Sequence, residues 1–179
     1  MSKILEVNSE KKPRVLIVTG PCGSGKTTIT SLIVRNSSFI RISGDDIKNE
    51  LFPEIENITD KPEALEKVYD EILQRAKRHF ENGQDIVIDY VVLGQRRIEE
   101  YKKIFSNSLK IRVLLSRKEI MIQRDQLREC WTSGEECIAA LYDSFNQLKD
   151  YIGAHNYIDN SEETTEETYL KHFAALLPE

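Results

Sequence analysis

The sequence predicts an α/β fold in which a five-stranded parallel sheet lies between two layers of helices. Apolar, β-branched runs typical of buried strands alternate with longer segments whose apolar residues recur every three or four positions, as in amphipathic helices. The first of these strands leads through a glycine-rich loop directly into a helix. Because strands that are separated by helices pair in parallel and are covered on both faces, we expect three layers, α/β/α.

The first half of the chain supplies three of the strands. Each is a short apolar run that ends at a polar or glycine-containing turn, and a segment with helical apolar spacing follows each of the first two. Proline in the first turn favours the start of the long helix, and Asn82-Gly83 favours its end. The expected elements are, in order, a strand at 14–19, a glycine-rich loop, a helix that ends near 36, a strand at 39–43, a short helix at 47–52, a long helix that starts near 62, and a strand at 85–89.

The second half adds two strands and four helices. The sequence Thr132-Ser133-Gly134 separates two of the helices, and the capping box Thr164-x-x-Glu167 opens the last one. The expected elements are, in order, a helix with an apolar face over 98–105, a strand at 109–115, a helix at 118–131, a helix at 138–152, a short strand at 156–159, and a closing helix at 164–177.

The glycine-rich loop is the most specific motif in the chain. It reads Gly20-Pro21-Cys22-Gly23-Ser24-Gly25-Lys26-Thr27 and matches the phosphate-binding pattern G-x-x-x-x-G-K-[ST]. Its glycines let successive N–H groups turn inward around a phosphate, and the helix that follows adds the positive end of its dipole. We expect Lys26 on the β- and γ-phosphates, Thr27 on Mg²⁺, and Thr28 as a further nucleotide contact. The sequence therefore predicts a P-loop NTPase fold that binds ATP or GTP with Mg²⁺.

Three aspartates follow predicted strands and should lie beside this loop, because the carboxyl ends of parallel strands meet at one edge of the sheet. Asp45 and Asp46 come after the second strand, where one carboxylate can accept the proton of an attacking hydroxyl group. Helix capping explains the pair equally well. Asp89 ends the third strand, and a carboxylate at the end of a buried apolar run needs a partner. We favour a metal or substrate contact for Asp89, with a structural hydrogen bond as the alternative.

Two arginines on the predicted helix after the fourth strand are candidates for contacting the phosphates. Arg124 and Arg128 are four residues apart and share one helical face, and Arg117 lies seven residues before Arg124 on the same stripe. From a lid over the nucleotide, which we place at about 117–136, such arginines can stabilise the transition-state charge. The alternative is a solvated charged face whose arginines pair with acidic neighbours such as Asp125.

Composition limits the remaining possibilities. With 179 residues and 40% hydrophobic content, we expect residues 1–179 to form a single domain, as a monomer or a small homo-oligomer. The net charge of −5 and the absence of a block rich in Lys and Arg argue against a nucleic-acid partner. The three cysteines match no zinc or disulfide pattern, and no apolar run is long enough to span a membrane, so we expect a cytoplasmic protein.

Taken together, the loop, the strand-end acids and the paired arginines resemble the small P-loop kinases. The chain is most similar to the chloramphenicol phosphotransferase-like branch, with zeta toxins, gluconate kinases and polynucleotide kinases as relatives. Two local patterns carry this likeness, Gly44-Asp45-Asp46 followed by Phe52-Pro53, and the run from Ile86 to Gly94. The resemblance covers the whole chain, although only the phosphate loop is highly specific.

The resemblance implies roles for individual residues. By likeness to the antibiotic-kinase branch, Asp46 is the base that accepts the proton of the substrate hydroxyl, whereas likeness to the polynucleotide kinases places the base at Asp45. Of the two, we favour Asp46. Arg124 and Arg128 match the lid arginines. The loop Asp159-Asn160-Ser161 resembles the one that covers the adenine in relatives.

The chain also departs from the antibiotic kinases. Tyr90 stands where they carry a second acid, and the lid segment is unlike theirs, so their substrate is not carried over. The sequence therefore predicts an ATP-dependent phosphotransferase acting on a hydroxyl of a small molecule. The alternatives are a nucleotide or polynucleotide 5′-hydroxyl kinase and a non-catalytic ATP-binding regulator. Gln95, Arg96 and Arg97 are candidates for contacting the acceptor, with an exposed first helical turn as the alternative.

Overall fold

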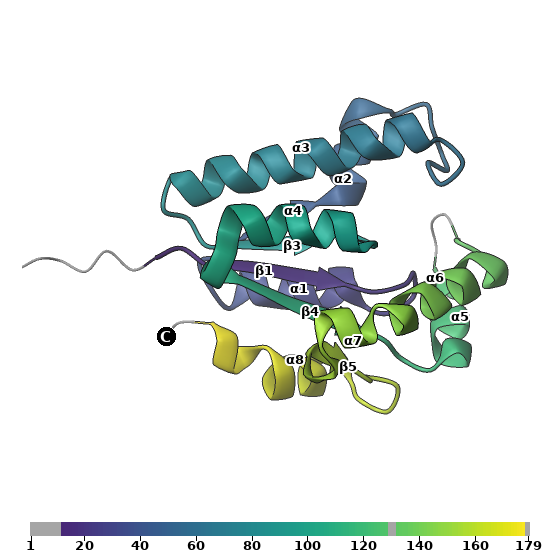
Figure 1. The fold of residues 1–179 in the computed structure, drawn as a ribbon. Coiled ribbons are helices and arrows are strands. Elements are labelled where there is room, and N and C mark those ends of the chain that lie inside the picture. The colour runs from purple at the N-terminus through teal and green to yellow at the C-terminus, as the bar shows by residue number, and fades with distance from the viewer. Residues whose placement is uncertain (1–11, 129–131, 178–179) are drawn as a thin grey trace, which may run out of the picture.

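The computed structural model describes residues 12–128 and 132–177, and it confirms the predicted α/β architecture. One sheet of five parallel strands lies between helices on both of its faces (Figure 1). The strand order is β2-β3-β1-β4-β5, so β1 occupies the centre and β3 and β4 flank it. The strands are β1 (Val15–Thr19), β2 (Ile40–Ser43), β3 (Ile86–Asp89), β4 (Leu109–Leu114) and β5 (Tyr157–Ile158).

Eight α-helices are assigned within the described residues. They are α1 (Lys26–Arg35), α2 (Gly44–Leu51), α3 (Pro62–Glu81), α4 (Gln95–Phe105), α5 (Lys118–Gln126), α6 (Glu135–Gln147), α7 (Lys149–Ile152) and α8 (Thr165–His172). Short 3₁₀ turns cover Ser106–Ser108, Ala154–Asn156 and Ala174–Leu176. No helix among the described residues is both long enough and apolar enough to cross a membrane.

The two faces of the sheet carry separate hydrophobic cores. On one face, Ile17 and Ile88 of the strands pack with buried residues of α2, α3, α4, α6 and α7. On the other face, Leu16 and Val18 pack with α1 and with Phe173, which follows α8. This alternation along β1 is the two-residue period expected of a strand that is buried on both sides.

The strand register places several predicted functional residues at one edge. Val18 pairs with Asp89 between β1 and β3, and Ser43 pairs with Asp89 between β2 and β3. Thr19, the last residue of β1, is therefore level with the ends of the two neighbouring strands. The glycine-rich loop, the start of α2 and Asp89 consequently meet at the carboxyl edge of the sheet, as predicted.

The helix at 47–52 was predicted to start too late. Helix α2 begins at Gly44, because the Ser43 hydroxyl caps it by accepting a hydrogen bond from the Asp46 N–H at 3.2 Å. A Cβ atom at Gly44 would lie 2.0 Å from the ring of Tyr90, so only glycine fits between this helix and the residue after β3. Asp45 and Asp46 therefore occupy the first turn of α2 without capping it.

The helix predicted at 118–131 is also too long. Helix α5 ends at Gln126, and the prediction for 129–131 lies outside the described residues. The chain turns back after α5 because the buried Asp125 carboxylate accepts hydrogen bonds from the backbone N–H groups of Ser133 and Gly134, at 2.8 and 3.2 Å. Arg128 therefore lies beyond the helix and does not share a helical face with Arg124, contrary to the prediction.

The helix predicted at 138–152 is divided into α6 and α7 at Leu148. In a continuous helix, the carbonyl of Phe145 would accept a hydrogen bond from the N–H of residue 149. Here that carbonyl accepts instead from the Tyr157 hydroxyl at 2.6 Å and from the Leu148 N–H at 3.2 Å. A side chain from β5 thus interrupts the helical ladder at this point.

Candidate active site

The glycine-rich loop folds tightly against two neighbouring elements. Gly20, Gly23 and Gly25 all adopt positive φ angles, of 143°, 76° and 92°. A Cβ atom at Gly20 would lie 2.2 Å from the carbonyl oxygen of Leu114, and one at Gly23 would lie 2.2 Å from that of Met121. Backbone conformation and close packing against β4 and α5 therefore both require glycine at these two positions.

This loop presents hydrogen-bond donors that the protein itself does not use. Within the described part of the chain, the backbone N–H groups of Gly23, Gly25, Lys26 and Thr27 donate no hydrogen bond. The Lys26 ammonium group folds back over the loop and donates to the carbonyls of Gly20 and Pro21, at 3.0 and 2.8 Å. Unused N–H groups at a helix N-terminus, next to a lysine, fit the phosphate groups of a nucleotide.

Arg124 is attached to the loop through two buried polar residues. Its guanidinium donates to the Ser116 hydroxyl and to the Asn160 carbonyl, both at 3.0 Å. The Ser116 hydroxyl donates to Oδ1 of Asn160 at 2.6 Å, and Nδ2 of Asn160 donates to the Ser24 carbonyl at 3.2 Å. Partial burial lowers the pKa of Arg124, and the charge of Asp159 opposes that shift. This network fixes Arg124 relative to the glycine-rich loop.

Asp89 is buried and takes part in a polar cluster that the sequence did not reveal. Its Oδ2 atom accepts from the Thr30 hydroxyl at 3.0 Å and from Nε and Nη2 of Arg41, at 3.0 and 2.6 Å. No hydrogen bond to Oδ1 occurs among the described residues. The partner that a buried carboxylate requires is therefore an arginine on β2. Thr27 lies exposed at the start of α1, one helical turn from Thr30.

Asp45 carries the perturbed carboxyl group of the site. Its side chain is open to solvent on one side, while surrounding protein atoms partly desolvate it on the others. This desolvation raises the pKa of Asp45 above its ordinary 3.8. The positive charge of Lys26 opposes the shift, and the negative charge of Asp89 adds to it. Arg128 lowers the pKa and Asp46 raises it by smaller amounts. The charges of the phosphate-loop lysine and of the arginine beyond α5 therefore both act on Asp45.

Arg128 is joined to the fold through Asp125. One of its guanidinium nitrogens, Nη1, lies 3.5 Å from Oδ1 of Asp125, and this carboxylate oxygen has no hydrogen-bond partner among the described residues. Only 2% of the Asp125 side chain is exposed, against 37% of Arg128. The predicted alternative of pairing with Asp125 is thus present, but the acid lies in the protein interior instead of on a solvated face. The ion pair leaves Arg128 close enough to Asp45 to influence its pKa.

Tyr90 closes the site beneath α2. Its ring is buried and packs edge-on against Tyr69, with ring centroids 5.4 Å apart. The Tyr69 hydroxyl donates to the Val91 carbonyl at 2.6 Å. Burial raises the pKa of Tyr90, and the charges of Tyr69, Asp45 and Cys22 add to that effect. A neutral phenol therefore occupies the position where the antibiotic kinases carry an acid.

The two arginines at the start of α4 are engaged away from this site. Arg97 is buried, stacks its guanidinium over Tyr69, and forms ion pairs with Glu66, Asp70 and Glu100. Arg96 pairs with Glu66 at 2.6 Å. Both arginines tie α4 to α3, so the structure does not support their predicted contact with an acceptor, and Arg97 is not part of an exposed turn either.

Comparison with known proteins identifies the family. A family model described as an AAA domain matches residues 15–144, which is more than half of the chain. The chain belongs to this AAA domain family. The match begins at β1 and includes the glycine-rich loop, both aspartate sites and both arginines, so the motif residues of this AAA domain protein all lie inside the matched region.

Individual relatives are distant. The AAA domain protein is 24% identical to a guanylate kinase of Caldanaerobacter subterraneus subsp. tengcongensis over 169 residues, covering 83% of this chain and 80% of that protein. Its structure resembles a gluconokinase from Sinorhizobium meliloti 1021, with a TM-score of 0.65, 15% identity and 93% of each chain covered. It also resembles a chain of the Pnkp1/Rnl/Hen1 RNA repair complex, with a TM-score of 0.69, 17% identity and 84% of this chain covered.

These structural likenesses show the fold and not the substrate. The AAA domain protein spans only 49% of the matched chain in the RNA repair complex, so that protein's other parts have no counterpart here. The resemblance to the small P-loop kinases is confirmed. The protein therefore has the P-loop NTPase fold and shares it with the small kinases that it resembles.

Sequence reasoning missed Arg41 and Ser116, and it named Asp125 only as a partner on a solvated face. Arg41 gives no signal in the sequence because it reaches Asp89 across neighbouring strands that are 48 residues apart. Asp125 resembles any exposed acid on a charged helix, and only the tertiary fold shows that it is buried. Asn160 was noted through resemblance as part of an adenine-covering loop, and its bond to the Ser24 carbonyl shows that this loop touches the phosphate loop.

Proposed function

We propose that this protein transfers the γ-phosphate of ATP to a hydroxyl group of a small molecule. The observation that supports the proposal best is the place of Asp45 in the first turn of α2, at the carboxyl edge of the sheet, where the charges of Lys26 and Arg128 act on it. A phosphotransferase needs a proton acceptor beside the transferred phosphate and cations around it. A protein that only binds nucleotide has no use for this combination.

Asp45, in preference to Asp46, is the proposed base. Partial desolvation raises the pKa of Asp45, which brings its proton affinity closer to that of the hydroxyl being activated. The only hydrogen bond of Asp46 outside the helix, within the described residues, is the one that its backbone N–H donates to the capping Ser43 hydroxyl. This assignment follows the polynucleotide-kinase likeness and differs from the one that the antibiotic kinases imply.

Cationic groups of the chain have complementary proposed roles. Lys26 leaves the loop carbonyls to bind the β- and γ-phosphates, while the free N–H groups from Gly23 to Thr27 bind the phosphate oxygens. Arg124, fixed by Ser116 and Asn160, and Arg128, held by Asp125, neutralise negative charge on the nucleotide and on the transferred group. We place these arginines in a lid formed by about 117–136.

Mg²⁺ fits the donor set at this edge of the sheet. When bound, it offsets the negative charge of the β- and γ-phosphates. The Thr27 hydroxyl is the proposed protein ligand, and Asp89 contacts the hydrated metal through its Oδ1 atom, which no described residue uses. Arg41 and Thr30 hold the Asp89 carboxylate in place through Oδ2.

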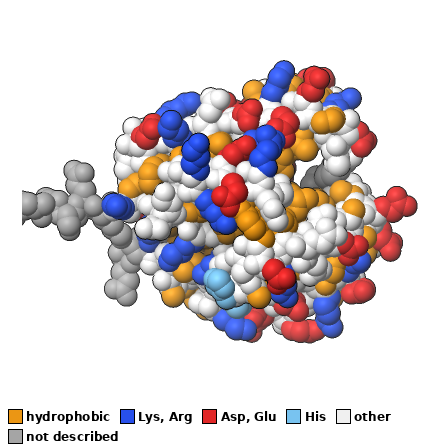
Figure 2. Space-filling view, viewed as in Figure 1, with side chains coloured by type: hydrophobic (Ala, Val, Ile, Leu, Met, Phe, Trp, Pro, Cys, Tyr) orange, Lys and Arg blue, Asp and Glu red, His pale blue; other side chains and the backbone are white. Residues whose placement is uncertain are grey.

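The two other interpretations remain as outcomes of the test. Across the face drawn in Figure 2, basic and acidic side chains are interspersed and form no broad basic surface, which favours a small acceptor over a polynucleotide on that face. A regulator that binds ATP without chemistry would leave the raised pKa of Asp45 without a use.

The test combines an untargeted product search with three variants. The protein is incubated with ATP, Mg²⁺ and a dephosphorylated metabolite extract, and mass spectrometry detects any compound that gains one phosphate. Asp45→Asn should lower product formation by about 100-fold or more, as expected for loss of a general base. Asp46→Asn should retain most activity, and Asp150→Asn, at an exposed acid of α7, is the matched control.

Three results would contradict the proposal. Loss of activity in Asp46→Asn but not in Asp45→Asn would move the base. Efficient phosphorylation of 5′-hydroxyl oligonucleotides would favour the polynucleotide alternative. Tight ATP binding without any product would favour the regulator.

A further inference from the structure

Most arginines that are at least half-buried in this fold form an ion pair with a carboxylate. Six arginines with this burial lie in the described residues, and four form such a pair: Arg14 with Asp85, Arg41 with Asp89, Arg75 with Glu50 and Glu71, and Arg97 with three acids. A guanidinium removed from water needs such compensation. The two exceptions are Arg124 and Arg112.

The two exceptions share an electrostatic signature. Burial lowers the pKa of both Arg112 and Arg124, which shows that the protein does not fully compensate either charge. For Arg124, in the nucleotide site, the missing partner is the anionic ligand proposed above. Arg112 lies on β4, where it pairs with Val18 of β1, and the groove that it lines contains no residue of the phosphate loop. Its missing partner is unexplained.

The geometry around Arg112 leaves one edge of the guanidinium available. Its Nη1 donates to the Ile111 carbonyl at 2.9 Å and to Oδ1 of Asn156 at 2.6 Å. Asn156 is itself fixed, because its Nδ2 donates to the Ile152 carbonyl at 2.8 Å. Neither Nε nor Nη2 has a partner among the described residues. These two nitrogens form the edge with which arginine binds a phosphate or carboxylate group through two parallel hydrogen bonds.

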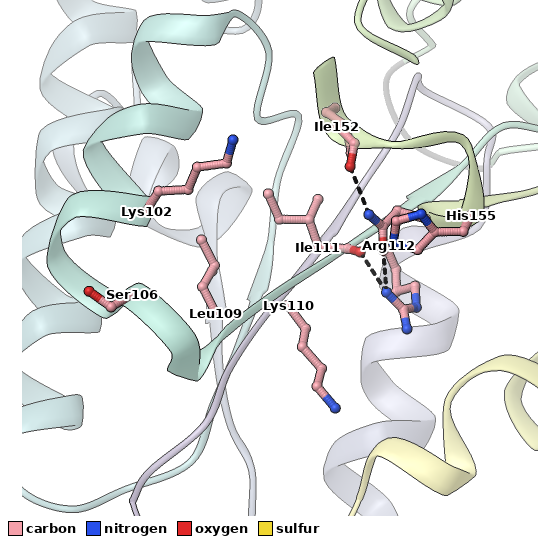
Figure 3. A pocket seen from close by; sticks show the side chains of 9 residues that line it. Lys102, Ser106, Leu109, Lys110, Ile111, Arg112, Ile152 and His155 are labelled. Atoms are coloured by element: carbon pink, nitrogen blue, oxygen red, sulfur yellow. Dashed lines mark hydrogen bonds between the residues drawn. The ribbon is translucent and has the colours of Figure 1, made fainter. Parts of the chain in front are cut away.

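Arg112 lines a groove of about 450 Å³ beside the open edge of β4 (Figure 3). Strand β5 pairs only with Val113 and Leu114, so the first part of β4 has no neighbour on this side. The groove is within the size range of small-molecule sites. Its lining consists of Lys102, Ser106, Leu109, Lys110, Ile111, Arg112, Ile152, His155 and Asn156.

The lining contains four basic side chains and no acid, although the chain carries a net charge of −5. Lys110 and His155 form no ion pair within the described residues. Lys102 forms one with Glu99, in which Nζ lies 3.4 Å from the carboxylate oxygen Oε1. In Figure 3 the basic groups surround the strand edge, with Lys102 on one side and the ends of Lys110 and Arg112 on the other. A ligand with a doubly charged group suits such a surrounding better than a single carboxylate.

We propose that this groove is a second ligand site, which binds a phosphorylated small molecule. Nε and Nη2 of Arg112 bind the phosphate group, and Lys110 adds positive charge. His155 offers a ring nitrogen for a hydrogen bond, and Leu109, Ile111 and Ile152 contact the apolar part of the ligand. The site is separate from the phosphate loop and does not depend on the function proposed above, because binding alone is its readout.

Phenyl phosphate is a suitable probe, since it joins a phosphate dianion to an apolar ring. The ¹⁵N-labelled protein is titrated with phenyl phosphate, phenol and benzoate, and amide NMR shifts are followed. Saturable shifts at Ile111 and Asn156 below about 10 mM phenyl phosphate are expected, with much weaker effects of phenol and benzoate. Shifts at Gly23 and Gly25 report any binding at the phosphate loop separately.

Variants assign the binding to Arg112. Arg112→Gln should weaken phenyl phosphate binding by about tenfold or more, and Lys110→Gln, at an exposed residue, by about two- to fivefold. Lys103→Gln is the matched control, because this exposed neighbour of Lys102 does not line the groove. If Arg112→Gln does not fold, as its amide spectrum will show, the Lys110→Gln comparison decides.

The proposal is overturned by any of four results. The first is the absence of a saturable shift in the groove of the wild-type protein, and the second is phenol binding as tight as that of phenyl phosphate. The third is undiminished phenyl phosphate binding by the folded Arg112→Gln variant. The fourth, where that variant fails to fold, is undiminished phenyl phosphate binding by Lys110→Gln. Benzoate binding as tight as that of phenyl phosphate would overturn the assignment to phosphate and make the site one for carboxylates.

Discussion

Asp125 offers the sharpest test of how the segment after α5 is held. Only 2% of this side chain is exposed, and its Oδ2 atom accepts hydrogen bonds from the N–H groups of Ser133 and Gly134, immediately before α6. Asp125→Ala removes both bonds and the ion pair with Arg128. The substitution should therefore loosen the connection between α5 and α6 and lower the stability of the whole domain.

The expected magnitude follows from the exposure of each partner. Water can replace the carboxylate at Gly134, which is exposed, so most of the penalty falls on the Ser133 N–H. Arg128 is more than one third exposed, and loss of its ion pair contributes little. Removal of a buried charge offsets part of the loss. We expect Asp125→Ala to lower the unfolding free energy by about 2 kcal/mol and the melting temperature by about 4–8 °C.

Thermal unfolding followed by circular dichroism measures this effect. Asp125→Asn keeps one oxygen for the Ser133 N–H and should lose about half as much stability, while Asp150→Asn should melt within about 1 °C of wild type. Equal losses in Asp125→Ala and Asp125→Asn would show that the charge matters and the hydrogen bonds do not. A wild-type melting temperature in Asp125→Ala would refute the reasoning altogether.

Two further predictions concern the start of α2. Gly44→Ala places a Cβ atom 2.0–2.6 Å from three ring atoms of Tyr90, so urea unfolding should show a loss of about 2 kcal/mol, and adding Tyr90→Ala should relieve the clash. For Asp45, a pKa raised above 3.8 means that the folded state holds the proton more tightly, so its contribution to stability decreases as pH rises through that range. Asp45→Asn should therefore melt above wild type at pH 7, and this advantage should vanish below pH 3.8; a lower melting temperature at pH 7 would contradict it.

Local patterns in the sequence were sufficient to predict the fold and the phosphate loop. Strand, glycine loop and helix are encoded within about twenty consecutive residues, and the parallel sheet follows from their alternation. The meeting of Asp45 and Asp89 at one edge followed from topology alone, because every strand of a parallel sheet ends on the same side.

The parts that could not be predicted depend on contacts between distant residues. The pairing of Arg41 with Asp89 requires the neighbourhood of β2 and β3 and their register, which neither segment encodes by itself. Helix α5 has no apolar periodicity that marks its end, and its termination depends on a hydrogen bond to a residue eight positions later. Helical spacing therefore placed Arg128 inside a helix that ends before it, and the contact of Arg128 with a phosphate stays a prediction.

The nucleotide site and the β4 groove have one feature in common, a partly buried arginine without a carboxylate partner. Near the carboxyl edge the protein compensates Arg41 internally and leaves Arg124 with neutral partners, which is what a site for an external anion requires. An uncompensated cation lowers the stability of the free protein, so its retention is easiest to understand where a ligand restores the balance. Arg112 also lacks a carboxylate partner in the described part of the chain. Its Nη1 donates to neutral groups, the Ile111 carbonyl and the Asn156 side chain, and no described residue accepts from Nε or Nη2. If a phosphate ligand stabilises the protein through Arg112, as we propose that ATP does through Arg124, each ligand should raise the melting temperature separately. Saturating both sites should then give an additive shift.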